Sequence, residues 1–270
     1  MDMALKAGAA GHGAAPGAGG RAMPAMRQTQ LPGETIAQTS GGVVAASNGP
    51  VRMANSTISG GTVTATAGSH IVSFTGSQTL TGGVVLSGPF DINNSTGLVL
   101  PAGLTHSGTI LVNTEGGGSV TTLQIADGTT LGGSGTVLLN ATQGVLDRAE
   151  VYSPTHLAWT HGAGHTIRGR GNLYYNLTNN GTITADQNGE VLQMLQGVAT
   201  NNGTLNTAGG GTLQFSGETV NQSPGGVISA SGGPVAMAST TVAGGTIASS
   251  GGNHVVGTAG TQTFGAGGTL

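Results

Sequence analysis

The amino-acid sequence predicts an all-β chain that folds as a single parallel β-helix with about 22 residues per coil. Three observations support this fold: a long internal repeat, a shorter glycine–threonine rhythm, and alternation of apolar and polar residues between the turns. A β-sandwich is the alternative fold. Its turn signals would recur roughly every 8–12 residues, which fits the observed rhythm less well.

The long repeat joins two segments of the chain that lie 184 residues apart. Residues 30–86 align without a gap with residues 214–270, and 27 of the 57 positions are identical. The matches include Met, Glu, Pro and His, such as His70 with His254, so a glycine-rich composition alone does not explain them. We therefore predict one complete unit over residues 30–213 and a partial second copy over 214–270.

The shorter rhythm is a glycine followed by Thr or Val and then an apolar residue, with neighbouring copies mostly 17–29 residues apart. The clearest pair, Asn-Asn-Gly-Thr-apolar at 179–183 and 201–205, is spaced by 22 residues. Glycine and asparagine accept the positive φ angles of tight corners. Stacked coils also allow asparagine side chains to form a ladder along the rod.

The segments after these turns alternate in the manner of β-strands. Val63 and Ala65 share one side and Thr64 the other, and Leu213 and Phe215 likewise share a side. A period of two with β-branched residues between Gly and Asn turns predicts strands that bury one face. Together these strands predict a β-helix of about eleven coils over residues 30–270.

Two segments depart from this strand pattern. Residues 1–29 are mostly Ala and Gly with few bulky side chains, so we predict a disordered tract there. Residues 145–151, which contain Asp147, Arg148 and Glu150, are the one place where we expect a helical turn. No secretion signal is visible in the chain.

The composition excludes several classes of function. Seven Lys and Arg residues cannot form the basic surface that nucleic-acid binding requires. The chain contains no cysteine, which removes disulfide scaffolds and thiolate metal sites. No run of about 18 apolar residues exists, so we expect no membrane insertion by a helix of this segment. We expect no cofactor.

One segment, residues 147–175, concentrates the chemistry of the chain, because it holds its only Trp, all three Tyr, and three of its seven His. Aromatic faces stack on sugars, and Arg or His side chains bind hydroxyls and carboxylates. The segment therefore predicts a ligand-binding platform, with a polysaccharide as the expected partner. An irregular loop that satisfies its own polar groups is the alternative. The candidate ligand-binding residues are Arg148, Tyr152, His156, Trp159, His161, His165, Arg168, Arg170 and Tyr174.

Neither a metal site nor catalysis is predicted for this segment. The spacing of His156, His161 and His165 would suit a helix better than a glycine-rich strand-and-turn context. Asp147 and Glu150 could resemble the carboxylate pair of a glycosidase. So close in sequence and beside an arginine, they are better explained as a solvated pair, so we predict no enzyme.

Several phrases carry a resemblance to known proteins, notably NNGTITA at 179–185, NNGTLNTAGGGTLQFSG at 201–217, GGVISASGG at 225–233 and HTIRGRGNL at 165–173. They resemble repeats of large bacterial surface and secreted β-helix proteins: filamentous-haemagglutinin-like adhesins, autotransporter passengers and giant repetitive exoproteins. The resemblance implies a right-handed parallel β-helix, export, and an extracellular or cell-surface location with an adhesive or matrix role.

The function that we predict is a structural and adhesive rod of a bacterial cell surface or matrix, which contacts polysaccharide or a host surface. A carbohydrate-binding or carbohydrate-active β-helix with its site around residues 147–175 is the alternative. A mostly disordered low-complexity chain is a third possibility. Exposed strand edges at the ends of a solenoid favour pairing with further strands, so end-to-end self-association is also expected.

Overall fold

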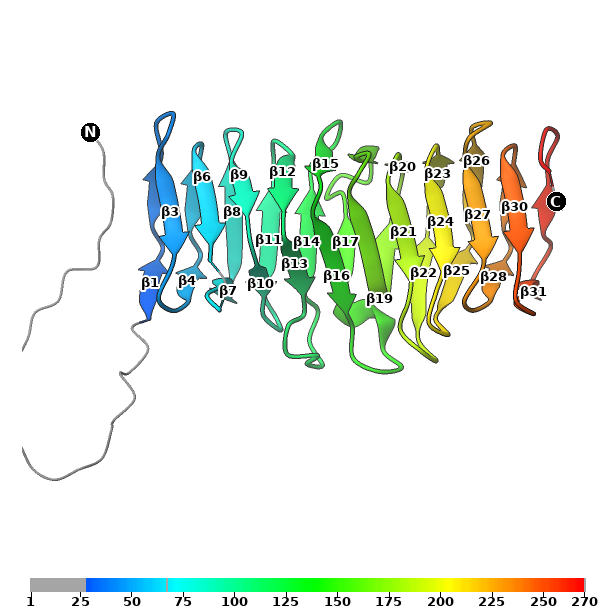
Figure 1. The fold of residues 1–270 in the computed structure, drawn as a ribbon, viewed down its shortest axis with the longest axis horizontal. Coiled ribbons are helices and arrows are strands. Elements are labelled where there is room, and N and C mark those ends of the chain that lie inside the picture. The colour runs from blue at the N-terminus through cyan, green and yellow to red at the C-terminus, as the bar shows by residue number, and fades with distance from the viewer. Residues whose placement is uncertain (1–27, 67, 270) are drawn as a thin grey trace, which may run out of the picture.

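The computed structural model describes residues 28–66 and 68–269, and over these residues the chain is a parallel β-solenoid (Figure 1). The described part contains 32 strands and one 3₁₀ helix, which wind through eleven turns of about 22 residues. The predicted all-β parallel solenoid is confirmed. The tract predicted to be disordered lies outside the described residues except for its last two, and Thr29 already belongs to the first strand.

Each turn contributes one strand to each of three faces, which we call faces A, B and C. Face A contains β1 (Thr29–Pro32), β4 (Val51–Ala54), β7 (Ile71–Thr75), β10 (Phe90–Ile92), β13 (Thr109–Val112), β16 (Thr136–Asn140), the first half of β19 (Thr166–Tyr174), β21 (Thr182–Ala185), β24 (Thr204–Thr207), β27 (Val227–Ala230) and β30 (Thr246–Ser249). Face B contains β2 (Thr35–Ala37), β5 (Thr57–Ser59), β8 (Ser77–Thr81), β11 (Gly97–Leu100), β14 (Thr122–Ile125), β17 (Glu150–Tyr152), the second half of β19, β22 (Val191–Leu195), β25 (Thr212–Ser216), β28 (Val235–Ala238) and β31 (Val255–Ala259). Face C contains β3 (Val43–Ala46), β6 (Thr62–Ala65), β9 (Val85–Ser87), β12 (Leu104–Ser107), β15 (Thr130–Gly133), β18 (Trp159–His161), β20 (Leu177–Asn179), β23 (Val198–Asn201), β26 (Thr219–Gln222), β29 (Thr241–Ala243) and β32 (Thr263–Phe264).

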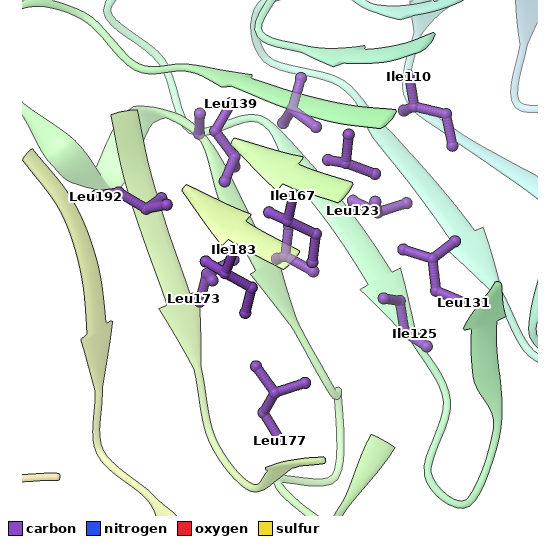
Figure 2. Close-up of a cluster of buried hydrophobic side chains, with 14 of the residues drawn as sticks. Ile110, Leu123, Ile125, Leu131, Leu139, Ile167, Leu173, Leu177, Ile183 and Leu192 are labelled. Carbon is purple, nitrogen blue, oxygen red and sulfur yellow. The ribbon is translucent and has the colours of Figure 1, made fainter. Parts of the chain in front are cut away.

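The core is a set of aliphatic ladders, because the parallel register places equivalent side chains of successive turns directly above one another. On face A, Ile110 pairs with Val137, Val137 with Ile167, and Ile167 with Ile183, and all four side chains are fully buried. Figure 2 shows Ile110, Ile167 and Ile183 among the buried side chains that fill the interior. Burial of each such side chain contributes about 1.5–3 kcal/mol to folding.

The alternation predicted from the sequence is confirmed where the structure describes it. Val63 and Ala65 are buried and Thr64 is partly exposed, and Leu213 and Phe215 are both buried. The helical turn expected at 145–151 is the 3₁₀ helix η1 (Leu146–Arg148), after which the chain enters β17. β-branched residues occupy the strands because their stiff side chains fit the pleated surface.

The 184-residue repeat does not correspond to a whole number of turns. β1 on face A of the first described turn is equivalent in sequence to β25, which lies on face B of the ninth. In the same way β3 on face C is equivalent to β27 on face A. The repeat therefore spans eight and one-third turns, and equivalent residues of the two copies lie on different faces of the rod.

The aliphatic ladder leads to a stability prediction. We expect Ile183→Ala to lower the free energy of unfolding by about 2–5 kcal/mol, because the cavity would lie between two neighbouring turns. Ile183 is fully buried, whereas Thr182 beside it on β21 is partly exposed. Thr182→Ala is the matched control and should change stability by less than about 0.5 kcal/mol. Urea unfolding followed by circular dichroism measures both, and equal effects would contradict the ladder as the source of stability.

Candidate functional site

The nine residues predicted as a ligand platform do not form one surface, because the strands of residues 147–175 lie on all three faces. Tyr152 and Tyr174 lie on face B and Arg168 on face A. Trp159 and His161 belong to β18 on face C, but both side chains point into the solenoid. The segment is therefore an ordered part of the solenoid that presents different residues in different directions.

Face B gathers the two tyrosines around a carboxylate. Glu150 of β17 pairs in register with Asn172 of β19, and the Asn172 side-chain amide donates a hydrogen bond to the Tyr174 hydroxyl at 3.0 Å. Burial and the nearby charge of Glu150 raise the pKa of Tyr174 to about 12. Burial also raises the pKa of Glu150, while its hydrogen bond to Tyr174 acts in the opposite direction. Burial first, and then the charge of Glu150, raise the pKa of Tyr152.

A second aromatic pair borders this group where the chain leaves face B. The rings of His156 and Tyr175 stack with centroids 3.8 Å apart, and Tyr175 lies 5.6 Å from Tyr174. His156 and Tyr175 have φ angles of 63° and 69°. Such positive angles are uncommon for residues other than glycine. We call Glu150, Tyr152, His156, Tyr174 and Tyr175 the aromatic surface.

Amide side chains extend the aromatic surface along the rod. Gln124 pairs in register with Tyr152 on one side. On the other side, Gln193 pairs with Asn172, and Gln214 pairs with Gln193. Sequence reasoning did not single out Tyr175 as a ligand residue or this amide row, although the spacing of the two glutamines by nearly one coil is the signal that could have found the row.

Trp159 is a core residue. Its side chain is 1% exposed, and its indole nitrogen has no hydrogen-bond partner among the described residues. In the Trp-Thr-His sequence of β18 the middle residue, Thr160, points outward, so both of its neighbours must point inward. Trp159 therefore cannot stack on a ligand that approaches from solvent.

His161 and His165 belong to a buried chain of histidines at the corner between faces C and A. His106 Nδ1 lies 3.0 Å from His165 Nε2, and His165 Nδ1 lies 2.9 Å from His161 Nε2. All three side chains are at most 1% exposed. His106 reaches His165 because the intervening turn has glycine at this corner: a Cβ on Gly135 would lie 2.3 Å from His106 Nδ1.

The histidine chain continues into a ladder of amides. His161 Nδ1 lies 2.7 Å from Asn179 Oδ1, and the Asn179 amide donates to Asn201 Oδ1 at 2.8 Å. Asn201 in turn donates to Gln222 Oε1 at 3.0 Å, and Gln222 donates to the carbonyl of Gly244. The expected asparagine ladder is confirmed at Asn179 and Asn201, and it lies inside the rod.

Each of the three arginines of residues 147–175 lies beside a carboxylate. The charge of Arg148 also acts on Glu150 of the aromatic surface, where it opposes the rise that burial causes in the pKa of that carboxyl. Arg168 forms an ion pair with Asp186 at 2.5 Å, and Arg170 forms one with Glu190 at 3.1 Å. Arg148, at the end of η1, lies 3.4 Å from its neighbour Asp147. Each of these cations thus has a carboxylate beside it, which reduces its attraction for the negative charge of a ligand.

The described residues contain no group of three or more His, Asp or Glu side chains arranged to hold a metal ion. In the same part of the chain, no helix combines the length and apolar character of a membrane crossing. Comparisons of the chain with protein-family models, with curated proteins and with solved structures find no match.

The histidine chain predicts its own protonation pattern. The Asn179 amide nitrogen also lies 3.4 Å from the Thr204 carbonyl, and Asn179 Oδ1 accepts from the Gly181 N–H, so His161 Nδ1 must carry a proton. Each following contact then requires an Nδ1–H donor on His165 and on His106. We expect nitrogen-15 NMR at pH 8 to show three neutral Nδ1–H tautomers. Nε2–H signals from these residues would contradict the direction of the chain.

The same chain predicts a pH dependence of stability. Burial lowers the pKa of His106 and of His161 to about 4, and that of His165 to about 3. Between about pH 4 and 6.5 the unfolded chain binds protons that the folded chain does not, so the free energy of unfolding should fall as the pH falls. Each histidine contributes a slope of about 1.4 kcal/mol per pH unit. Urea unfolding at a series of pH values measures it.

Glu218 predicts a pH dependence of stability that is opposite in sign to that of the histidines. Burial raises its pKa to about 7, although a hydrogen bond from the Gly197 N–H acts against this shift. Its stabilising contribution is present below about pH 4.5 and is lost as the pH rises through 7. Glu218→Gln should therefore steepen the rise between pH 4.5 and 7, whereas His165→Gln should flatten it. If the free energy of unfolding of both variants changed with pH as it does in the parent chain, the pKa shifts given for Glu218 and His165 would be wrong.

Proposed function

We propose that the chain is a structural and adhesive rod of a bacterial cell surface or extracellular matrix. The observation that carries this proposal is the parallel strand pairing that continues along all three faces through the described turns, with register shifts at Met53/Ala54 and Met237/Ala238. Hydrogen bonds and aliphatic ladders join each turn to the next, so bending the rod would open both. Such a body suits the display of surfaces at a distance from an anchor.

The outward residues support an adhesive role with little dependence on salt. Thr109, Thr136, Thr166, Thr182 and Thr204 pair in register along face A. Their hydroxyl groups both donate and accept hydrogen bonds and carry no charge. Long rows of hydroxyl and amide groups match the repeated hydroxyl groups of a polysaccharide, and they would bind through many weak contacts together.

The test uses the full chain coupled to beads and a panel of neutral and acidic polysaccharides. We expect retention of at least one polysaccharide without release of new reducing ends or unsaturated sugars. Released products would overturn the non-catalytic assignment and would direct attention to Glu150 and Asp147. Failure to retain any polysaccharide or matrix preparation would overturn the adhesive assignment.

A carbohydrate-binding site at the aromatic surface is the second candidate. The convergence of three tyrosines, a histidine and Glu150 at face B and the corner that follows it favours this candidate. The rings can contact the apolar face of a sugar, while carboxylate and amide groups accept from or donate to its hydroxyls. This candidate uses the rod as a scaffold and needs no catalysis.

The aromatic surface can be tested separately from the hydroxyl rows. We expect Tyr152→Ala combined with Tyr175→Ala to weaken retention of a neutral polysaccharide about tenfold or more, as losing two stacking contacts would. Thr105→Ala on β12 of face C, an exposed residue outside both the aromatic surface and the face A hydroxyl row, is the control and should leave retention unchanged. Equal retention by the double variant and the parent chain would exclude this surface as the binding site.

A further inference from the structure

A shallow cleft on face A lies several turns away from residues 147–175 and belongs to neither surface described above. It has a volume of about 270 Å³, and its lining includes Arg52, His70, Val72, Asp91 and Asn93. Binding pockets for drug-sized ligands usually measure about 300–1,000 Å³. The cleft is therefore of a size for one small group rather than for an extended ligand.

The register of three strands explains why a cleft forms here. Arg52 of β4 pairs with Val72 of β7, and Val72 pairs with Asp91 of β10, so the three side chains form one outward row. Two turns separate Arg52 from Asp91, which corresponds to about 9–10 Å at the usual strand spacing. The short Val72 side chain between two longer ones forms the floor of the cleft.

Arg52 provides the distinctive chemistry of the cleft. Arg148, Arg168 and Arg170 each lie within 4 Å of a carboxylate. Within residues 28–66 and 68–269, no carboxylate lies at ion-pair distance from Arg52. Instead, its guanidinium carbon lies 4.5 Å from the centre of the Phe74 ring. A cation–π contact holds the guanidinium in place without neutralising its charge.

On the opposite wall, His70 and Asn93 each lie beside a carboxylate. His70 Nδ1 lies 2.7 Å from Asp91 Oδ2, and the Asn93 amide donates to Glu115 at 3.3 Å. Burial raises the pKa of Asp91, and the nearby His70 acts against that shift. The Asp91 carboxylate thus lies beside the His70 ring in the wall of the cleft, where its oxygens can accept hydrogen bonds from hydroxyl groups.

The second copy of the repeat keeps some of the residues that line this cleft and replaces others. Pro50, His70 and Val72 recur there as Pro234, His254 and Val256, whereas Arg52 and Phe74 are replaced by Ala236 and Thr258. β28 and β31, which carry these replacements, still pair in parallel. The solenoid therefore does not need Arg52 and Phe74 for its fold, and the two residues change together.

We propose that this cleft binds one carboxylate-bearing sugar residue, with its carboxylate on Arg52 and its hydroxyl groups on Asp91 and Asn93. The planar guanidinium matches a carboxylate with two parallel hydrogen bonds. The spacing of the two walls accommodates a ring whose acidic and hydroxyl groups lie on opposite sides. This site is independent of the proposed adhesive role and of the aromatic surface.

The experiment is an NMR titration of the full chain with galacturonate, glucose and acetate as three separate probes. We expect saturable shifts of face A residues with galacturonate, and much weaker binding of the other two. Equal affinity for acetate would overturn the sugar assignment, because it would show a simple carboxylate site. Absence of saturable binding by galacturonate, or equal binding of glucose, would overturn the proposal itself.

Two variants assign the binding to Arg52. Arg52→Ala introduces the residue that the second copy carries, so the chain should fold, and the affinity for galacturonate should fall about tenfold or more. Arg168→Gln, which removes an arginine already paired with Asp186, is the matched control and should bind as the parent chain does. Unfolding midpoints of both variants verify the fold. Unchanged galacturonate binding by Arg52→Ala would overturn the proposal.

Discussion

The in-register stacking of one buried aliphatic side chain per turn is the constraint on which the rest of this structure depends. From Ile110 through Val137, Ile167 and Ile183, each turn places a branched apolar residue directly on that of the turn before. A slip of one residue would turn every such side chain to the outside. The register that keeps the core intact therefore also determines which residues line each outer face.

The polar interior at one corner follows from the same register. His161, Asn179 and Asn201 occupy equivalent inward positions of successive turns, where each side chain satisfies its neighbour. Buried polar groups are tolerated when they are hydrogen-bonded, and stacking supplies the partner automatically. His106 joins this ladder across a turn whose corner is glycine, so space as well as register decides which polar groups meet.

The 184-residue sequence repeat is not a whole number of structural turns, and this difference determines where repeated residues lie on the surface of the rod. Because one unit spans eight and one-third turns, the second copy presents its equivalent residues a third of a turn away from those of the first. The cleft at Arg52 on face A thus has its counterpart position, Ala236, on face B. A rod built in this way distributes any repeated feature around its circumference.

The sequence alone determined the fold class, the number of coils and the inward or outward direction of most strand residues, because these depend on local period and on a repeat visible in one chain. It also located the unusual chemistry of residues 147–175. Only the tertiary structure decided that Trp159, His161 and His165 are interior and that Arg168 and Tyr174 point to different faces. The nine-residue strand β19 bends from face A to face B at Gly169 and Gly171, whose φ angles are positive. In so glycine-rich a chain, these two glycines do not by themselves single out a change of face. The contacts of His106 with His165 and of His70 with Asp91 join residues 59 and 21 positions apart. Such contacts depend on how coils of unequal length align, which the sequence period only approximates.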